Sequence, residues 1–409
     1  MNAPLEGLTV IECSLLEPGQ LGMILGSLGA DVIKVEAPGS GDYSRELGWP
    51  IIDGVSLLHW HVNQAKRSIV IDLRLPEGAE VFLDLARRAD VVVSGMRPGA
   101  LDRRGLGYDQ LRAVNQRIVF CELSGYGATG PYRDMPSHGV GFDAWAGCIP
   151  PAVDDQGFTF IPPSPSIGTR VGAVWGAMAV VAAVMRAQRD GVGCSIDIAQ
   201  SDAAAYTNWI VPEGNRAYQR PEPEVTGNPA DGGLRRAPGL GGSGEAVRYQ
   251  YYRSSDGHVL FMASEREFWE NFCRGVDRLD LFERRPGMKY ADHAIGDREL
   301  RRELQEIFEQ RSTADWVRFG MDVNTPIARV NDGHSILDDP QFLHRFPWLP
   351  AAEHGTDLMP VPVKFVGEEL PAPRRAPEHG EHTDEVLRTV LGYDETTMSR
   401  LRERSVVAG

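Results

Sequence analysis

Residues 8–36 read LTVIECSLLEPGQLGMILGSLGADVIKVE, and this stretch decides the fold class. Two apolar runs, Leu8–Cys13 and Gly29–Glu36, have the pattern of strands, and Gly19–Leu28 between them has that of a helix interrupted by glycine. A strand, a helix and a second strand in this order predict a βαβ unit with parallel strands. Because turn residues follow at Ala37–Asp42, we expect a ligand-binding loop at the carboxyl end of the second strand.

The same alternation continues along the chain. Strand patterns occur at Ser68–Asp72, Asp90–Val93 and Ile118–Leu123, and Pro76–Arg88 has the pattern of a helix with proline at its start. This order predicts an α/β fold with a mostly parallel sheet and helices on both faces. The glycines do not form GxGxxG after a strand, so the sequence does not indicate a nicotinamide-binding fold.

A long apolar segment lies near the middle of the chain. Val171–Arg189 is apolar around nearly its whole circumference, so we expect a buried helix, followed by a short strand at Ser195–Ile198. The apolar core of this helix, Val171–Met185, is shorter than the ~18 residues of a membrane span. Thr169 occupies the predicted N-cap position, where either a plain capping role or a nearby anion fits.

The composition limits the partners of this protein. The chain has 409 residues, which is too long for one compact core, so we expect two domains. Its formal net charge of −15 argues against nucleic acid or an anionic membrane as the main partner, but it leaves room for a local basic pocket that binds a phosphorylated ligand. The start of the chain shows no signal-peptide pattern, and we expect a cytoplasmic protein.

The cysteines predict buried thiols. They are odd in number and show neither CxxC nor His-rich spacing, so we expect neither disulfides nor a metal site. The five residues are Cys13, Cys121, Cys148, Cys194 and Cys273.

The amino-acid composition changes after the central helix. Arg220–Gly244 is dense in proline, glycine and charge. Its last part is either a solvated linker or a mobile flap over a site, because catalytic lids are loops of this kind. The flap glycines would be Gly239, Gly241, Gly242 and Gly244. Short strands and amphipathic helices from Val247 to about Thr325 indicate a second, smaller domain. Pro360–Val363 suits an edge strand at best.

Several blocks together resemble the class III CoA-transferases (the CaiB/BaiF family), which include formyl-CoA transferases and α-methylacyl-CoA racemases. The blocks run through the whole chain and are Pro4–Gly7, Gly29–Glu36, Lys66–Leu73, Ala89–Val91, Arg97–Gly105, Ser124–Gly127, Gly141–Asp143 and Gly380–Thr383. The resemblance implies a split large α/β domain formed by residues 1–215 and 330–409, with residues 216–329 holding the linker, the flap and a small α+β domain. It also implies two ring-shaped protomers interlocked as a dimer.

The resemblance further implies a CoA site. By position in these blocks, the residues that would hold CoA are Glu17, Lys66, Gly95, Met96, Arg103, Arg104, Ser124 and Tyr126. The chemistry agrees, because CoA carries phosphate charges that Lys66, Arg103 and Arg104 neutralise and an adenine that Met96 packs against. Taken singly, each basic residue is more often a solvated surface charge. CoA and acyl-CoA would be substrates, with no permanently bound cofactor.

The chain departs from the family pattern at two chemical positions. Transferases of the family carry a catalytic Asp after the glycine that begins the central helix, and here Thr169 follows Gly168. Racemases carry a His where this chain has Phe142, and His138 is out of register, as expected of an exposed loop residue. The transferase cycle passes from an anhydride to an enzyme thioester and back to an anhydride. An ester of Thr169 would be more stable than these intermediates and would stop the cycle, so we expect that Thr169 does not replace the Asp. The fallback carboxylates are Glu122, Asp134 and Asp143, each of which also fits a capping or structural role.

Three functional hypotheses follow. In the favoured one, the chain is the subunit without the catalytic Asp in a heteromeric CoA-transferase, similar to that of benzylsuccinate CoA-transferase. CoA would then move between acyl groups, and we expect transfer from succinyl-CoA to a dicarboxylic or aromatic acid. The second is a stand-alone acyl-CoA isomerase, epimerase or dehydratase that uses other carboxylates, and the third is a non-catalytic acyl-CoA-binding protein. The expected partner is a homologous subunit that carries the catalytic Asp, or a second copy of this chain in a homodimer. The sequence does not identify the acyl groups.

Overall fold

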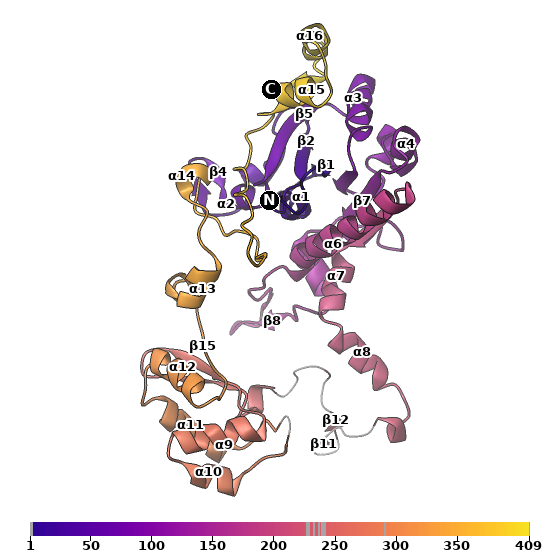
Figure 1. Cartoon of the computed structure of the whole chain (residues 1–409). Helices are drawn as coiled ribbons and strands as arrows, with labels where there is room; N and C mark the ends of the chain where they lie inside the picture. The colour runs from indigo at the N-terminus through magenta and orange to yellow at the C-terminus, as the bar shows by residue number, and fades with distance from the viewer. Residues whose placement is uncertain are drawn as a thin grey trace. The chain divides into compact units, whose positions relative to one another are not determined.

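The structure is a computed structural model that describes residues 3–408 except 226–229, 232–233, 236–237, 239–242 and 290–291. The chain forms two compact units: unit 1 comprises Met1–Trp209 and His344–Gly409, and unit 2 comprises Ile210–Leu343. Unit 1 is therefore built from both ends of the chain, and the yellow C-terminal helices lie beside its indigo strands in Figure 1. The predicted domain boundaries after residues 215 and 329 stay a prediction.

A seven-stranded sheet organises unit 1, in the order β10-β7-β6-β1-β2-β5-β16. Neighbouring strands are parallel except β16, which pairs antiparallel with β5. The strands are β1 Thr9–Ser14, β2 Asp31–Glu36, β5 Lys66–Ile71, β6 Val91–Gly95, β7 Val119–Ser124, β10 Ser195–Ala199 and β16 Val407–Ala408. The predicted mostly parallel α/β sheet is confirmed, whereas the antiparallel edge strand at the C-terminus had no sequence signal.

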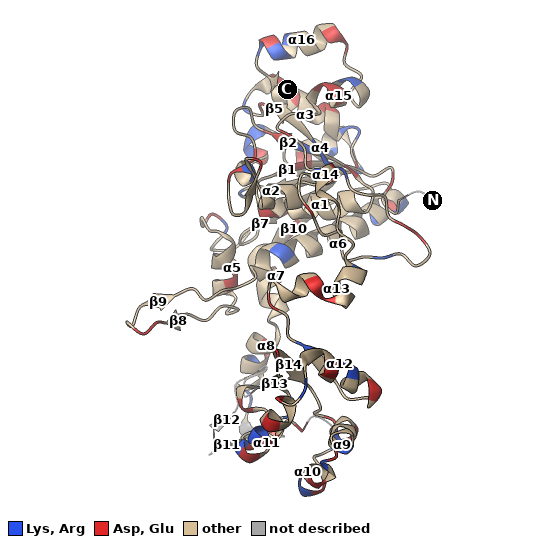
Figure 2. Ribbon diagram, turned by 90° about the vertical axis from the view of Figure 1, so that its left-hand side faces the viewer, with Lys and Arg blue, Asp and Glu red and all other residues tan. Residues whose placement is uncertain are grey.

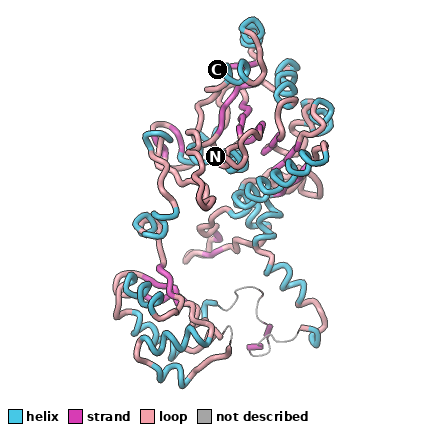
Figure 3. The backbone as a smooth tube through the Cα atoms, in the orientation of Figure 1, coloured by secondary structure: helices cyan, strands magenta, loops and turns pink. Residues whose placement is uncertain are grey.

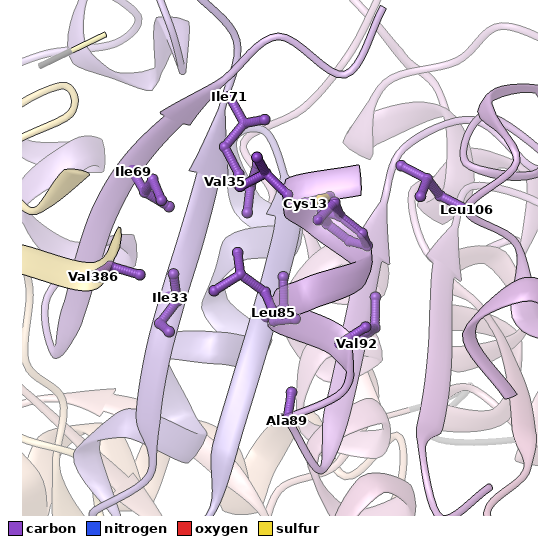
Figure 4. Close-up of a cluster of buried hydrophobic side chains, with 14 of the residues drawn as sticks. Cys13, Ile33, Val35, Ile69, Ile71, Leu85, Ala89, Val92, Leu106 and Val386 are labelled. Atoms are coloured by element: carbon purple, nitrogen blue, oxygen red, sulfur yellow. The ribbon is translucent and has the colours of Figure 1, made fainter. Parts of the chain in front are cut away.

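Helices cover both faces of this sheet, as predicted. One face packs on α1 Gln20–Ser27 and α6 Ile167–Asp190, and the other on α3 Pro76–Ala86, α4 Tyr108–Val114, α15 Thr383–Thr389 and α16 Glu395–Glu403. Successive strand residues point to opposite faces, so Ile11 and Cys13 join the α3 side while Val10 joins the α1 side. Figure 4 shows the α3 side, where Cys13 and Val35 lie near Leu85.

Helix α6 is longer and less buried than the sequence predicts. It begins at Ile167, and small residues such as Gly172, Ala173 and Ala177 are its buried face. The opposite face exposes Val174, Met178 and Met185 by 55%, 54% and 66%. The prediction of a helix buried all round is therefore wrong for this face. At 24 residues, α6 also has the length and composition of a membrane span, but its buried face packs in the core of unit 1.

The rest of unit 1 consists of short elements and a long return segment. The helices are α2 Leu57–Val62, α5 Gly139–Trp145, α7 Gln200–Thr207 and α14 Ala351–His354, with 3₁₀ turns at η1 Glu17–Gly19, η2 Tyr43–Arg45 and η3 Asp102–Arg104. The hairpins pair β3 Ile51–Ile52 with β4 Val55–Ser56 and β8 Ala152–Val153 with β9 Thr159–Phe160. Residues 355–382, drawn mostly as loop in Figure 3, lead to α15 and include Pro360–Val363, which forms no strand.

Unit 2 has its own aromatic core. Strands β13 Gln250–Arg253, β14 His258–Phe261 and β15 Ile327–Arg329 form an antiparallel sheet beside helices α9 Arg266–Gly275, α10 Leu279–Arg284, α11 Arg298–Phe308 and α12 Thr313–Asp322. In α11, Leu300, Leu304, Ile307 and Phe308 recur at helical spacing and enter this core. The remaining elements are α8 Ile210–Ala217, η4 Glu222–Glu224, β11 Ala230–Asp231, β12 Leu234–Arg235, η5 Ser243–Glu245, η6 Ser335–Asp338 and α13 Pro340–Arg345, which runs into unit 1.

Candidate active site

A cleft of about 720 Å³ lies in unit 1 where several parallel strands end. Its walls include Leu15–Pro18 after β1, Gly95–Pro98 at the end of β6, and Leu123–Tyr126 at the end of β7. Ligands of open α/β sheets bind outside the carboxyl ends of the strands. The cleft therefore lies where this fold class places an active site.

Most of the predicted CoA-binding residues meet at this cleft. The structure places Glu17, Gly95, Met96, Arg103, Arg104, Ser124 and Tyr126 in its walls, together with Thr169. At Gly95 a β-carbon would lie 2.6 Å from Ser14 Cβ, so glycine lets the end of β6 approach the end of β1. Ser124 Oγ is buried and has no hydrogen-bond partner among the described residues.

Lys66 lies apart from the other predicted residues. It does not line the cleft, and its side chain is fully buried. Its Nζ donates to Glu12 Oε1 at 2.8 Å, to the Gly19 carbonyl at 2.7 Å and to Asn63 Oδ1 at 3.1 Å. An ammonium group with three protein acceptors has no donor left for a phosphate. This position does not favour the predicted contact between Lys66 and CoA.

The cleft is basic although the chain is acidic. The exposed side chains of Arg97, Arg103 and Arg104 line it, and so does the half-buried Arg133. Arg103 donates to the Pro98 carbonyl at 3.4 Å. A local cluster of guanidinium groups attracts phosphate oxygens even on a protein of negative net charge. Sequence reasoning missed Arg97 and Arg133; Arg97 directly follows Met96 within a family block, which was the available signal.

Thr169 is not the N-cap of α6, which corrects the prediction. The helix begins at Ile167, and Thr169 Oγ1 donates to the Ser166 carbonyl at 3.1 Å. The backbone N–H groups of Ile167 and Gly168 donate to the two carboxylate oxygens of Asp143, each at 2.7 Å. Asp143 therefore caps the helix from another element, and Thr169 is a buried side chain in the first turn.

The fallback carboxylates have structural partners. Both oxygens of the fully buried Asp143 accept helix N–H groups. Glu122 Oε1 accepts the Gly99 N–H at 3.1 Å, and burial raises the pKa of this carboxyl despite that hydrogen bond. Asp134 lines the cleft but is 81% exposed and pairs with Arg133 at 3.3 Å. Neither Glu122 nor Asp143 lines the cleft.

A buried ionic network lies behind the loop that carries Glu17. Lys34 Nζ contacts Asp42 Oδ2 at 2.9 Å and Glu12 Oε1 at 3.3 Å, and Glu12 also binds Lys66. Burial lowers the pKa of Lys66 to about 8, although Glu12 opposes this. Burial would also lower the pKa of Lys34, but Glu12 and Asp42 outweigh it and hold this pKa above its usual value. The available sequence signal was a charged residue inside two apolar strand patterns, Glu12 in the first and Lys34 in the second.

Two aromatic side chains, Tyr126 and Phe142, line another part of the cleft. Tyr126 makes edge contacts with Phe142, Tyr132 and Trp145, at ring-centroid distances of 5.3, 5.8 and 6.1 Å. Phe142, at the position of the racemase His, is buried and offers no acid or base. His138 is exposed as predicted, yet it lines the cleft.

The flap prediction lies largely outside the described residues. Gly239, Gly241 and Gly242 lie outside the described residues. Gly244 lies in η5 of unit 2, at a separate 490 Å³ cleft.

The cysteines are mostly buried. Cys13, Cys121 and Cys273 are buried as predicted, whereas Cys148 and Cys194 are half-buried. Among the described residues, no group of three or more His, Cys, Asp or Glu side chains has the arrangement of a metal site.

Comparisons with known proteins agree with the geometry. The family model of CoA-transferase family III matches residues 5–383. Human succinyl-CoA:glutarate CoA-transferase is 27% identical over 99% of this chain and 90% of its own length. The β subunit of succinyl-CoA–L-malate CoA-transferase from Chloroflexus aurantiacus is 29% identical over 99% of this chain and 98% of its own. A CaiB/BaiF family protein from Brucella suis has a similar fold, with a TM-score of 0.77 at 24% identity, covering 96% of this chain and 100% of its own.

Proposed function

Because the chain belongs to CoA-transferase family III, we propose that it binds an acyl-CoA in the cleft of unit 1 and takes part in moving CoA to a second carboxylic acid. The observation that carries this proposal is the group of four arginines, Arg97, Arg103, Arg104 and Arg133, around a cleft at the strand ends of a chain with net charge −15. CoA is the substrate here and no permanently bound cofactor is needed.

The cleft offers complementary chemistry to both ends of CoA thioesters. Its guanidinium groups suit the phosphates, and Met96, which also packs on the core, offers its side chain to the adenine. Tyr126 and Phe142 give an aromatic wall for an acyl group. Two relatives bear names that pair succinyl-CoA with glutarate or L-malate, which supports succinyl-CoA as donor here and a dicarboxylic acid as acceptor. The aromatic acceptor has only the sequence resemblance behind it.

We further propose that a homologous subunit covers part of unit 1. The exposed apolar face of α6, with Val174, Met178 and Met185, is unusual for a protein surface exposed to water. The β8–β9 hairpin, which projects from unit 1 in Figure 2, adds the exposed side chains of Phe158 and Phe160. One relative is named a β subunit, which supports the predicted heteromer. The predicted interlocking of two protomers belongs to the same proposal.

The carboxylate that carries CoA has two possible sources. The sequence predicts an Asp of the partner subunit, because Thr169 cannot run the anhydride cycle. The other source is a carboxylate of this chain. The hypothesis of a stand-alone isomerase, epimerase or dehydratase finds little support, because Glu122 and Asp143 are engaged in hydrogen bonds away from the cleft.

Titration calorimetry with free CoA tests the binding part of the proposal. We expect the Arg103→Ala, Arg104→Ala double variant to bind CoA at least about tenfold more weakly, since each charged hydrogen bond contributes about 1.5–3 kcal/mol. Affinity should also fall with salt. The matched control is Arg112→Ala on α4, outside the cleft. Equal CoA affinity in the wild type and the double variant would contradict the assignment of the cleft.

The transfer itself is tested with succinyl-CoA as donor and glutarate, L-malate or an aromatic acid as acceptor. The chain is purified from its own host together with any subunit bound to it. We expect formation of the acceptor's CoA thioester with release of succinate. Hydrolysis or isomerisation of the thioester without transfer would contradict a CoA-transferase.

A further inference from the structure

Glu17 differs from the other carboxylates near the cleft. It lines the cleft, it is half-buried, and no hydrogen bond or ion pair of its side chain occurs within the part of the chain that the structure describes. A carboxylate in a cleft with no protein partner is free to contact a ligand. By contrast, Asp134 is exposed and pairs with Arg133.

Glu17 also lies beside the position of the missing Asp. A β-carbon at Gly139 would lie 3.4 Å from Glu17 Oε2 and 2.9 Å from Thr169 Cγ2. Both side chains therefore border the small space above Gly139, and all three residues line the cleft. A reacting carbonyl that approached Thr169 would also be within reach of the Glu17 carboxylate.

The turn that carries Glu17 is held from both sides by buried charges. Leu16 has a positive φ of 61°, which a leucine rarely adopts, and its N–H donates to Asp42 Oδ1 at 3.2 Å. On the other side of Glu17, the Gly19 carbonyl accepts from Lys66 Nζ at 2.7 Å. Asp42 and Lys66 are both buried within the ionic network. Backbone strain that is stabilised in this way clusters at functional sites, because it fixes a side chain in place.

The geometry points to Glu17 as the catalytic carboxylate of this chain, which carries CoA as a glutamyl thioester in place of the missing Asp. This inference rests on the proposed CoA-transferase function and names the group that performs its covalent step. It locates that step in this chain instead of on an Asp of the partner subunit.

The reaction balances with the carboxylate alone. Glu17 attacks the carbonyl of the donor thioester, the C–S bond breaks, and a mixed anhydride and CoA thiolate form. The thiolate attacks the Glu17 carbonyl carbon and releases the donor acid as its carboxylate. The acceptor carboxylate then attacks the glutamyl thioester and expels CoA thiolate. Attack of this thiolate on the acceptor's carbonyl gives the new thioester and frees Glu17. No proton or electron is gained or lost over the cycle.

Trapping tests the assignment without a variant. The full chain, with any subunit that co-purifies, is incubated with succinyl-CoA and then with hydroxylamine, which converts an enzyme thioester into a hydroxamate. Peptide mass spectrometry locates the modified residue. We expect the hydroxamate on Glu17. A hydroxamate on another carboxylate of this chain, or on the partner subunit, would overturn the inference and leave the proposed function standing.

Variants give the second measurement. Glu17→Gln keeps the size of the side chain and removes the nucleophile, so we expect transfer to fall by at least about 10³-fold, as loss of a nucleophile does elsewhere. CoA affinity should change much less. The matched control is Glu80→Gln, an exposed carboxylate on α3 outside the cleft. Transfer by Glu17→Gln at the wild-type rate would refute the role of Glu17. A wild-type chain that neither binds CoA nor transfers it would refute the proposed function as well.

Discussion

Asp143 and Gly168 are joined by a 2.7 Å hydrogen bond, in which the carboxylate accepts the backbone N–H near the start of the central helix. The other carboxylate oxygen accepts the neighbouring N–H of Ile167 at the same distance. Both N–H groups belong to the first turn of α6, where no intrahelical acceptor exists. Asp143 thus links α5 to the start of α6 and thereby fixes the position of Thr169 at the cleft.

The first prediction concerns this cap. Asp143→Ala should lower the free energy of unfolding by about 2–3 kcal/mol, because it leaves two buried N–H groups without an acceptor. Asp143→Asn should cost less, since its one carbonyl oxygen still accepts. Urea denaturation of the full chain, followed by far-ultraviolet circular dichroism, measures both. An Asp143→Ala protein with the unfolding free energy of the wild type would contradict the capping role of this carboxylate.

The fold was predictable from local patterns, and the start of α6 was not. Alternating strands and helices, as in Leu8–Glu36, follow from side-chain periodicity, which one chain segment displays by itself. The cap of α6 comes from a side chain 24 residues earlier, so no local signal indicates it. With its N-terminal N–H groups accepted by Asp143, the helix extends two residues before Thr169.

The candidate site was predictable in part for a similar reason. Family blocks indicated Arg103, Arg104 and Tyr126, which all line the cleft. Lys66 belongs to the same blocks, but the register of the parallel strands places Glu12 opposite Lys34, and Lys66 one strand farther on reaches the same carboxylate. Which groups a charged side chain in a strand contacts depends on the residues of the neighbouring strands, and the sequence alone does not show which strands are neighbours.

The second prediction follows from Lys66. Its pKa is about 8 in the folded protein against an ordinary value of 10.5. Between these pH values the unfolded chain binds a proton that the folded chain has released, so stability should rise with pH across this window. The Lys66→Met variant lacks this contribution. The difference in unfolding free energy between wild type and variant should therefore grow from pH 8 to pH 10.

Urea denaturation at several pH values measures that difference. A wild-type advantage that shrinks with rising pH would show that Lys66 binds its proton more tightly in the folded state, contrary to the expected direction.

The third prediction concerns a variant in which the carboxylate is removed from position 17 and introduced at position 169, on the other side of Gly139. If Glu17 carries CoA from one border of this space, a carboxylate introduced at position 169 should partly replace it, since both side chains approach Gly139. The Glu17→Gln, Thr169→Asp double variant should transfer at least about tenfold faster than Glu17→Gln alone, a modest part of the effect of a nucleophile. Glu17→Gln, Thr169→Asn has the same shape without the nucleophile and should show no recovery. Steady-state assays with succinyl-CoA compare the three proteins, and hydroxylamine trapping shows whether the thioester has moved to position 169. Equal rates for the Asp and Asn double variants, with CoA binding intact, would mean that the space above Gly139 is not where the acyl group reacts.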